Sequence, residues 1–169
     1  MSSQAYIENS SFTNNFALKS THGINMITSE LEVYTSTITF DPEFADQLDL
    51  TKLDCGFFSL FLGSTLRLGQ DSKISNLRAL DKAVLCAFSQ SNVYVQDGVQ
   101  LFNNTAESDS GRTFSMENTA NVEIRDAHFE SNPQSNLVVE LGTLDVVNST
   151  FTDGRANHIS GIDSKVTID

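Results

Sequence analysis

A short phrase of alternating apolar and polar residues recurs eight times along this chain. Each copy has an aliphatic residue at its centre and, two residues later, Asn, Asp or another small residue. The centres are Ile7, Val33, Leu53, Ile74, Val95, Ile124, Val146 and Ile168, spaced 20 to 29 residues apart. One strand-like phrase per ~20–25 residues is typical of solenoid proteins. The repeat therefore predicts an all-β solenoid that forms a single domain over residues 1–169.

Two further apolar columns appear when the copies are aligned on their centres. The column five residues after the centre contains Phe12, Ile38, Phe58, Ala79, Phe129 and Phe151, with Leu101 or Phe102 taking over in the fifth copy. The patch before each centre contains Ile24, Met26, Leu66, Leu68, Val84, Cys86, Phe114, Met116, Leu137, Val139 and Ile159. Three apolar stretches per repeat predict three strands per coil, which is a single-stranded parallel β-helix of about seven to eight coils.

The residues two positions after the centres form a turn column. Its members are Asn9, Thr35, Cys55, Asn76, Asp97, Asp126, Asn148 and Asp169. Asn and Asp tolerate bends and bond to nearby backbone, so this column predicts a chain reversal after each strand. A leucine-rich repeat is the alternative solenoid of this period. It is disfavoured because the Asn comes one residue too early, Val, Ile and Phe replace Leu, and no helical spacing fills the remainder. A β-sandwich would not keep one aligned phrase in every copy.

The formal net charge of −12 disfavours binding to nucleic acid or to an anionic membrane surface. The most apolar run, Gly56 to Gly63, is eight residues long and predicts a buried strand, well short of the ~20 residues that span a bilayer. The residues after Met1 do not predict a signal peptide, because they lead almost directly into the first strand-like phrase. Both ends lie inside the repeat, which predicts either a piece of a longer protein or a subunit that stacks end to end on its own kind.

Some coils carry the motif Phe-x-x-Asn, as Phe12-Thr13-Asn14-Asn15 and Phe129-Glu130-Ser131-Asn132, with a degraded copy at Phe151-Thr152-Asp153-Gly154. In this the chain resembles parallel β-helix proteins of the pectin-lyase-like class, especially polymorphic outer-membrane proteins and large protist surface proteins. The companion Gly-Gly-Ala-Ile motif of that group is missing, and only Gly23-Ile24 is similar to it. The resemblance implies a right-handed β-helix that is extracellular or at the cell surface. The same fold hosts polysaccharide lyases and hydrolases, but their acidic pairs and Gly-His-Gly motif are absent, so we predict no catalytic residue and no cofactor.

The best candidates for a charged site are Asp97 and Asp126, neighbours in the turn column with Arg125 beside them. Two stacked carboxylates could hold Ca²⁺. Glu123 above Asp145 is a second stacked pair that could do acid–base chemistry. The plainer interpretation, which we favour, is that the aspartates serve the turns and the second pair is a solvated face. His22, His128 and His158 fall in different columns without metal-ligand spacing.

Three N-glycosylation sequons begin at Asn9, Asn103 and Asn148. Turn chemistry explains Asn9 and Asn148, whereas Asn103 lies outside the predicted turn column and is the best candidate. Cys55 and Cys86 occupy different columns of different coils, so we predict two buried or half-buried thiols rather than a disulfide.

The predicted outer face carries Tyr6, Tyr34 and Tyr94 beside polar residues, which suits binding of glycans or proteins. The sequence therefore predicts a structural cell-surface protein, a filament or adhesin segment that assembles end to end. The alternative is a carbohydrate-active enzyme or carbohydrate-binding module of the same fold.

Overall fold

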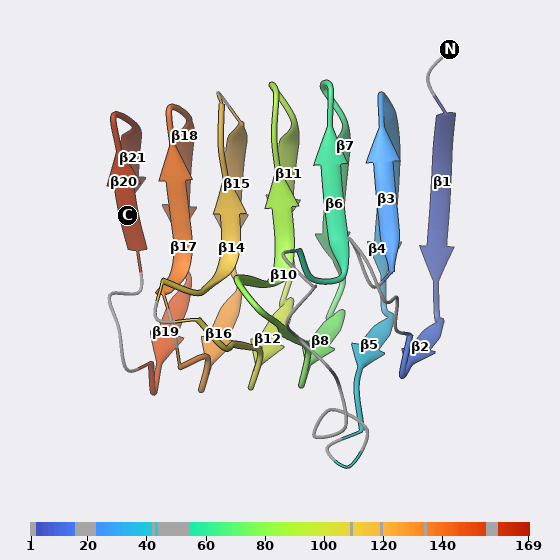
Figure 1. Ribbon diagram of the computed structural model, residues 1–169. Helices are drawn as coiled ribbons and strands as arrows, with labels where there is room; N and C mark the ends of the chain where they lie inside the picture. The colour runs from blue at the N-terminus through green and yellow to red at the C-terminus, as the bar shows by residue number, and fades with distance from the viewer. Residues whose placement is uncertain are drawn as a thin grey trace.

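The computed structural model describes residues 3–15, 23–41, 43, 55–108, 110–118, 120–133, 135–154 and 159–169. The secondary-structure elements of these residues are all β-strands, and every strand pairing is parallel. The strands form three long sheets and one short one (Figure 1).

Each sheet collects one strand from successive coils. Sheet A contains, in spatial order, β1 (Ser3–Glu8), β4 (Ser29–Tyr34), β7 (Thr65–Gly69), β11 (Asn92–Val95), β15 (Asn121–Arg125), β18 (Thr143–Val147) and β21 (Lys165–Ile168). Sheet B contains β2 (Ser11–Thr13), β5 (Thr37–Thr39), β8 (Lys73–Ser75), β12 (Gln100–Phe102), β16 (His128–Glu130) and β19 (Thr150–Thr152). Sheet C contains β3 (Ile24–Ile27), β6 (Phe58–Phe61), β10 (Lys82–Ala87), β14 (Arg112–Met116), β17 (Ser135–Glu140) and β20 (Ile159–Ile162). The short fourth sheet pairs β9 (Arg78–Ala79) with β13 (Thr105–Ala106).

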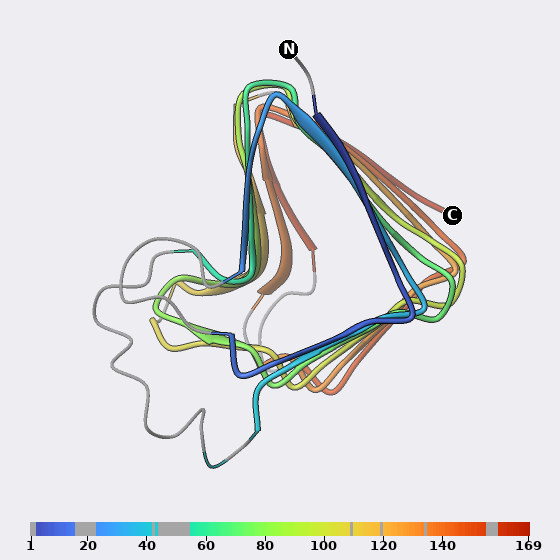
Figure 2. The same ribbon diagram turned by 90° about the vertical axis from the view of Figure 1, so that its right-hand side faces the viewer.

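The chain visits the three long sheets in the order C, A, B and then repeats. Seen along the stack, the coils superimpose on a three-sided outline, and the two termini lie at opposite ends of the stack (Figures 1 and 2). This arrangement is consistent with a β-solenoid and confirms the predicted parallel, repeated architecture at that level.

The core is a set of inward-facing columns, because side chains alternate across each strand. In sheet A one column runs through Ile7, Val33, Leu68, Val95, Ile124, Val146 and Ile168. The members in the middle of the sheet are at most 2% exposed. In sheet B the column runs through Phe12, Ile38, Ile74, Leu101, Phe129 and Phe151.

One of the predicted centres, Ile74, is therefore not in the central column. Ile74 lies in sheet B, and Leu68 takes its place in sheet A. Leu53 lies outside the described residues. The error has a local cause. Leu66 and Leu68 form the same apolar–polar–apolar phrase as the true centres, but the sequence alignment treats them as the apolar patch that precedes the centre Ile74. The alternative Leu101 is confirmed over Phe102, because Leu101 pairs with Phe129.

Other assignments around the middle coils shift for the same reason. Phe58 lies in sheet C, opposite Ile24, and Ala79 lies in the short strand β9. In β10 Leu85 and Ala87 pair with Phe114 and Met116 after a register shift between Lys82 and Leu85, and Val84 and Cys86 are buried as well.

Three corners connect the sheets, and each turns through left-handed residues two positions after an inward side chain. Corner AB contains Asn9, Thr35, Gln70, Asp97, Asp126 and Asn148; corner BC contains Asn14, Asn76, Asn103, Ser131 and Asp153; corner CA contains Thr28, Leu62, Gln90, Asn118, Leu141 and Asp163. All have positive φ, which Asn and Asp tolerate best after Gly. The predicted turn column is thus one of three, and Asn103, which was predicted to lie outside such a column, belongs to the second.

Candidate functional site: the outer face of sheet A

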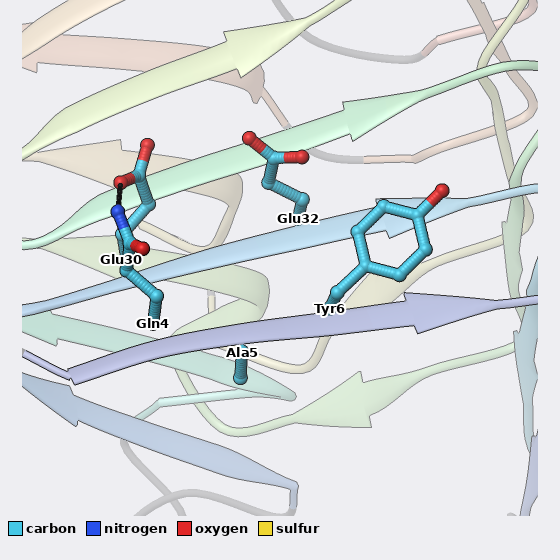
Figure 3. Close-up of a pocket in the computed structure, with 5 residues that line it drawn as sticks. All are labelled: Gln4, Ala5, Tyr6, Glu30 and Glu32. Carbon is cyan, nitrogen blue, oxygen red and sulfur yellow. Dashed lines mark hydrogen bonds between the residues drawn. The ribbon is translucent and has the colours of Figure 1, made fainter.

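The outer face of sheet A carries the aromatic and charged residues that the sequence placed in solvent. An open hollow of about 240 Å³ lies on it, lined by Gln4, Ala5, Tyr6, Glu30 and Glu32. Gln4 donates a hydrogen bond of 2.9 Å to Glu30, and Glu32 and Tyr6 stand on the same side of the sheet (Figure 3). Ala5 points to the other side, as alternation along β1 requires.

Aromatic rings and a guanidinium extend this face over four coils. The rings of Tyr6 and Tyr34 lie with their centres 5.6 Å apart. Arg67 lies over the ring of Tyr94, 4.2 Å from its centre, and its Nε is 3.4 Å from Glu30 and 3.8 Å from Glu32. We call these residues, Tyr6, Tyr34, Arg67 and Tyr94, the tyrosine strip. Such a cation–aromatic contact contributes about 0.5–1 kcal/mol at an exposed site.

Neighbouring carboxylates affect the ionisation of the strip. Partial burial raises the pKa of Tyr34, and the negative charge of Glu32 raises it further. The pKa of Tyr6 is also raised, by desolvation first and then by Glu8. Both phenols therefore remain protonated and able to donate hydrogen bonds across the neutral pH range.

A second ion-pair group lies farther along the same face. Glu123 stacks on Asp145 in register, as predicted. Arg125 donates to Glu123 and lies 3.0 Å from Asp145, and the hydrogen bond to Glu123 raises the pKa of Arg125. Arg125 thus pairs with both acids of this stack.

Asp97 and Asp126 are neighbours at corner AB, where the backbone N–H of Gly98 donates to the carbonyl of Asp126. Both are exposed, and Asn148 donates its side-chain N–H to Asp126. Within the described residues no three His, Cys, Asp or Glu side chains come together as a metal site would require. Arg125 forms ion pairs with Glu123 and Asp145, and the negative charge of Asp126 also contributes to its raised pKa.

The prediction of two free thiols is wrong. Cys55 and Cys86 form a disulfide whose Cα atoms are 5.9 Å apart. Cys55 is not a turn residue in sheet A; it forms an isolated parallel bridge with Lys82 at the start of β10, which brings it beside the strand that contains Cys86. The sequence argument failed because it placed Cys55 two residues after a false centre.

All three sequon asparagines are exposed on the surface. Asn103 donates a 2.7 Å hydrogen bond to Asn76, and Asn148 bonds to Asp126, each in the neighbouring coil. Their accessibility is compatible with the predicted modification.

His128 lies on the outer face of sheet B, whereas His22 and His158 lie outside the described residues. Its ring nitrogens bond to Thr150 and to Glu130, a hydroxyl–imidazole–carboxylate order that sequence columns did not reveal. The backbone N–H groups of His128 and Thr150 both donate to carbonyls of the preceding coil, so neither can stabilise an oxyanion. We therefore assign no nucleophilic chemistry to this group.

Arg67 is the residue of the tyrosine strip that sequence reasoning missed. The correct alignment, with Leu66 and Leu68 as sheet A residues, would have placed Arg67 beside Tyr94.

Within the part of the chain that the structure describes, no helix is long and apolar enough to cross a membrane. Comparisons with known protein families, with curated proteins and with solved structures gave no match.

Proposed function

We propose that this chain is a structural segment of an extracellular or cell-surface protein, a filament or adhesin, folded as a right-handed parallel β-helix of the pectin-lyase-like class and assembling end to end. The observation that carries the proposal is the change in exposure along the central column. Ile124 is fully buried at the middle of sheet A, whereas Ile168 in the same column is 62% exposed at its edge.

End-to-end stacking would cover these edges. Within the described residues, the outer edges of β1 and β21 pair with no other strand. If β21 of one copy pairs with β1 of the next, Ile168 packs on Ile7 and the column continues. Sheets B and C each have one strand fewer than sheet A, so sheet A supplies the backbone pairing at such a junction. A longer chain that continues the coils would cover the same edges.

The disulfide supports the proposed extracellular or cell-surface location. Disulfides persist in oxidising environments such as the extracellular space. Cys55 and Cys86 are at most 9% exposed, so this bond is shielded from soluble reductants. We propose on this basis that the protein matures outside the reducing cytosol.

The test combines electron microscopy with sedimentation of the purified chain. We expect filaments or concentration-dependent oligomers, and we expect Ile168→Asp to abolish them by placing a charge in the column that must be buried. Thr167→Asp, on the outer face of the same strand, is the matched control. A chain that stays monomeric at high concentration, with no difference between the variants, would sink the stacking proposal. Mass spectrometry of the native material would show whether Asn103 carries a glycan.

A carbohydrate-binding module is the second candidate, and the tyrosine strip favours it. Exposed tyrosine rings beside carboxylates and an arginine offer both stacking and hydrogen bonding to sugar rings. Its test is binding of the wild-type chain to a panel of polysaccharides. Loss of binding in Tyr6→Ala and Tyr34→Ala, but not in Phe102→Ala on sheet B, would support it. Polysaccharide binding that survives both substitutions would exclude the tyrosine strip as the binding site.

A further inference from the structure

Corner CA has a feature that the stacking of coils does not explain. Leu62 and Leu141 occupy left-handed positions, with φ of 54° and 53°. Their side chains are 61% and 52% exposed. A left-handed residue with a bulky side chain costs roughly 1–2 kcal/mol, and the equivalent corner positions elsewhere are mostly Asn, Asp, Ser or Thr. These two positions therefore carry an apolar group at a cost in backbone strain, without burying it in this chain.

The leucines lie on one ridge. The strand order of sheet C places its turns in the order Thr28, Leu62, Gln90, Asn118 and Leu141. Leu62 and Leu141 are three coils apart, which at the usual strand separation is about 14 Å. Between them lies an open hollow of about 420 Å³, lined by Leu62, Gly63, Ser89, Gln90 and Asn118. At the same end of the ridge Ile27 is 56% exposed.

This ridge differs from the rest of the surface in its lack of charged turn residues. The described residues that form its turns from Thr28 to Leu141 carry no charge. Glu117 and Glu140, which adjoin these turns, lie 4.0 and 3.2 Å from the guanidinium of Arg112, which offsets them. Asp163 occupies the next turn of the corner, one coil beyond Leu141. Corner AB, by contrast, stacks Asp71, Asp97 and Asp126. Two copies with a net charge of −12 each repel one another over most of their surface. An uncharged ridge is where they can approach.

We infer that corner CA is a lateral self-association surface, on which two copies of this chain pair side by side and antiparallel. A two-fold axis between the ridges would place Leu62 of each copy against Leu141 of the other, because both leucines protrude from one straight ridge. The contact would be isologous, as in most homodimers. Such a pairing is independent of end-to-end stacking, and it would join neighbouring filaments laterally.

The pairing predicts which engineered thiols meet. Leu62→Cys and Leu141→Cys proteins would be prepared separately and treated with a short bismaleimide, which leaves the native disulfide intact. We expect a cross-linked dimer from a mixture of the two proteins, and several-fold less from either alone. Equal yields in all three samples, or no dimer in any, would overturn the antiparallel pairing.

A second measurement separates association from folding. Because Asn is well tolerated at positive φ, Leu62→Asn combined with Leu141→Asn should leave the melting temperature unchanged or raise it. It should weaken self-association in sedimentation equilibrium by about tenfold or more. Thr28→Asn, at a left-handed position of the same ridge, is the matched control and should leave self-association unchanged. Added salt should strengthen pairing of the wild type by screening its acidic surface.

Two further outcomes would also overturn the inference. One is a double variant that associates as strongly as the wild type. The other is a wild-type chain that stays free of lateral dimers but binds phosphatidylcholine vesicles through the leucines. End-to-end filaments should survive the double variant, so failure here is distinguishable from failure of the proposed function.

Discussion

At the scale of single residues, two buried asparagines stabilise corner BC through hydrogen bonds between coils. Asn104 accepts a hydrogen bond from the N–H of Leu77 and donates to the carbonyl of Ile74, at 3.1 and 3.0 Å. Asn132 repeats the arrangement one coil on, with Asn104 and Leu101. Both asparagines are fully buried. At Asn132 the fourth residue of Phe-x-x-Asn is thus a backbone bridge between coils, a role that the motif alone does not disclose. Asn15, at the same place in the first copy, is exposed and donates to the carbonyl of Thr13 in its own coil.

We predict that Asn104→Ala lowers the free energy of unfolding by about 1–3 kcal/mol, because it leaves a buried N–H and a buried carbonyl without partners. Urea denaturation followed by circular dichroism measures the effect. Asn103→Gly is the matched control, since its side chain is exposed and Gly retains the left-handed backbone there. Equal losses in the two variants would contradict the bridging role.

The three tyrosines of the chain all lie on sheet A, so their ultraviolet titration reports on that face alone. The raised pKa of Tyr34 means that the folded chain holds its proton more tightly than the unfolded chain does. The resulting stability is complete below the usual tyrosine pKa of about 10 and is lost as the pH rises through the folded value. We expect Glu32→Gln to move the titration toward lower pH, because it removes the negative charge that opposes ionisation. Unchanged titration would show that Glu32 does not act on Tyr34.

At the scale of strands, close approach between coils restricts the start of β6. A Cβ on Gly56 would lie 1.9 Å from the carbonyl oxygen of Ala83, whereas one on Gly63 would meet nothing within 4 Å. We therefore predict that Gly56→Ala destabilises the fold by at least about 1–3 kcal/mol through overpacking. Gly63→Asn, at φ 76°, should be nearly neutral. Thermal melting of both variants decides the comparison, and equal melting temperatures would refute it.

The disulfide links the same segment to β10. Cys55 and Cys86 are 31 residues apart, so the bond closes a loop whose entropy in the unfolded chain is worth about 3–4 kcal/mol. We expect Cys55→Ser with Cys86→Ser to lose an amount of this order in guanidinium denaturation. Reductant added together with guanidinium, where unfolding exposes the buried bond, should lower the stability of the wild type and leave the double variant unaffected. A wild type that responds to reductant no more than the variant does would indicate that the bond does not form.

At the scale of the whole molecule, a solenoid shares its core among coils that contact only their neighbours. Ile124→Ala, in a fully buried position, should cost about 2–5 kcal/mol, whereas Ile168→Ala should cost little in the isolated chain because its side chain is already 62% exposed. If copies stack end to end, the cost of Ile168→Ala should rise toward that of Ile124→Ala at concentrations where filaments form. Calorimetry across a concentration series tests this, and a cost that never changes would count against stacking.

The sequence by itself determined the architecture, because a repeated apolar–polar–apolar phrase can bury its apolar column only by stacking like strands. It also determined the outer position of the tyrosines and the stacking of Glu123 on Asp145, since both follow from strand alternation. It could not determine the alignment of the middle coils. There the spacing between true centres stretches from Val33 to Leu68, and an insertion, unlike an alternation, leaves no local pattern.

Contacts across that irregular stretch were decided only by tertiary structure. The disulfide, the bonding of Arg67 to Tyr94, and the shared ridge of Leu62 and Leu141 join residues from different coils. Their proximity depends on how many residues each coil contains. Short-range preferences set the direction of each side chain, but the residue count of every coil sets which side chains meet.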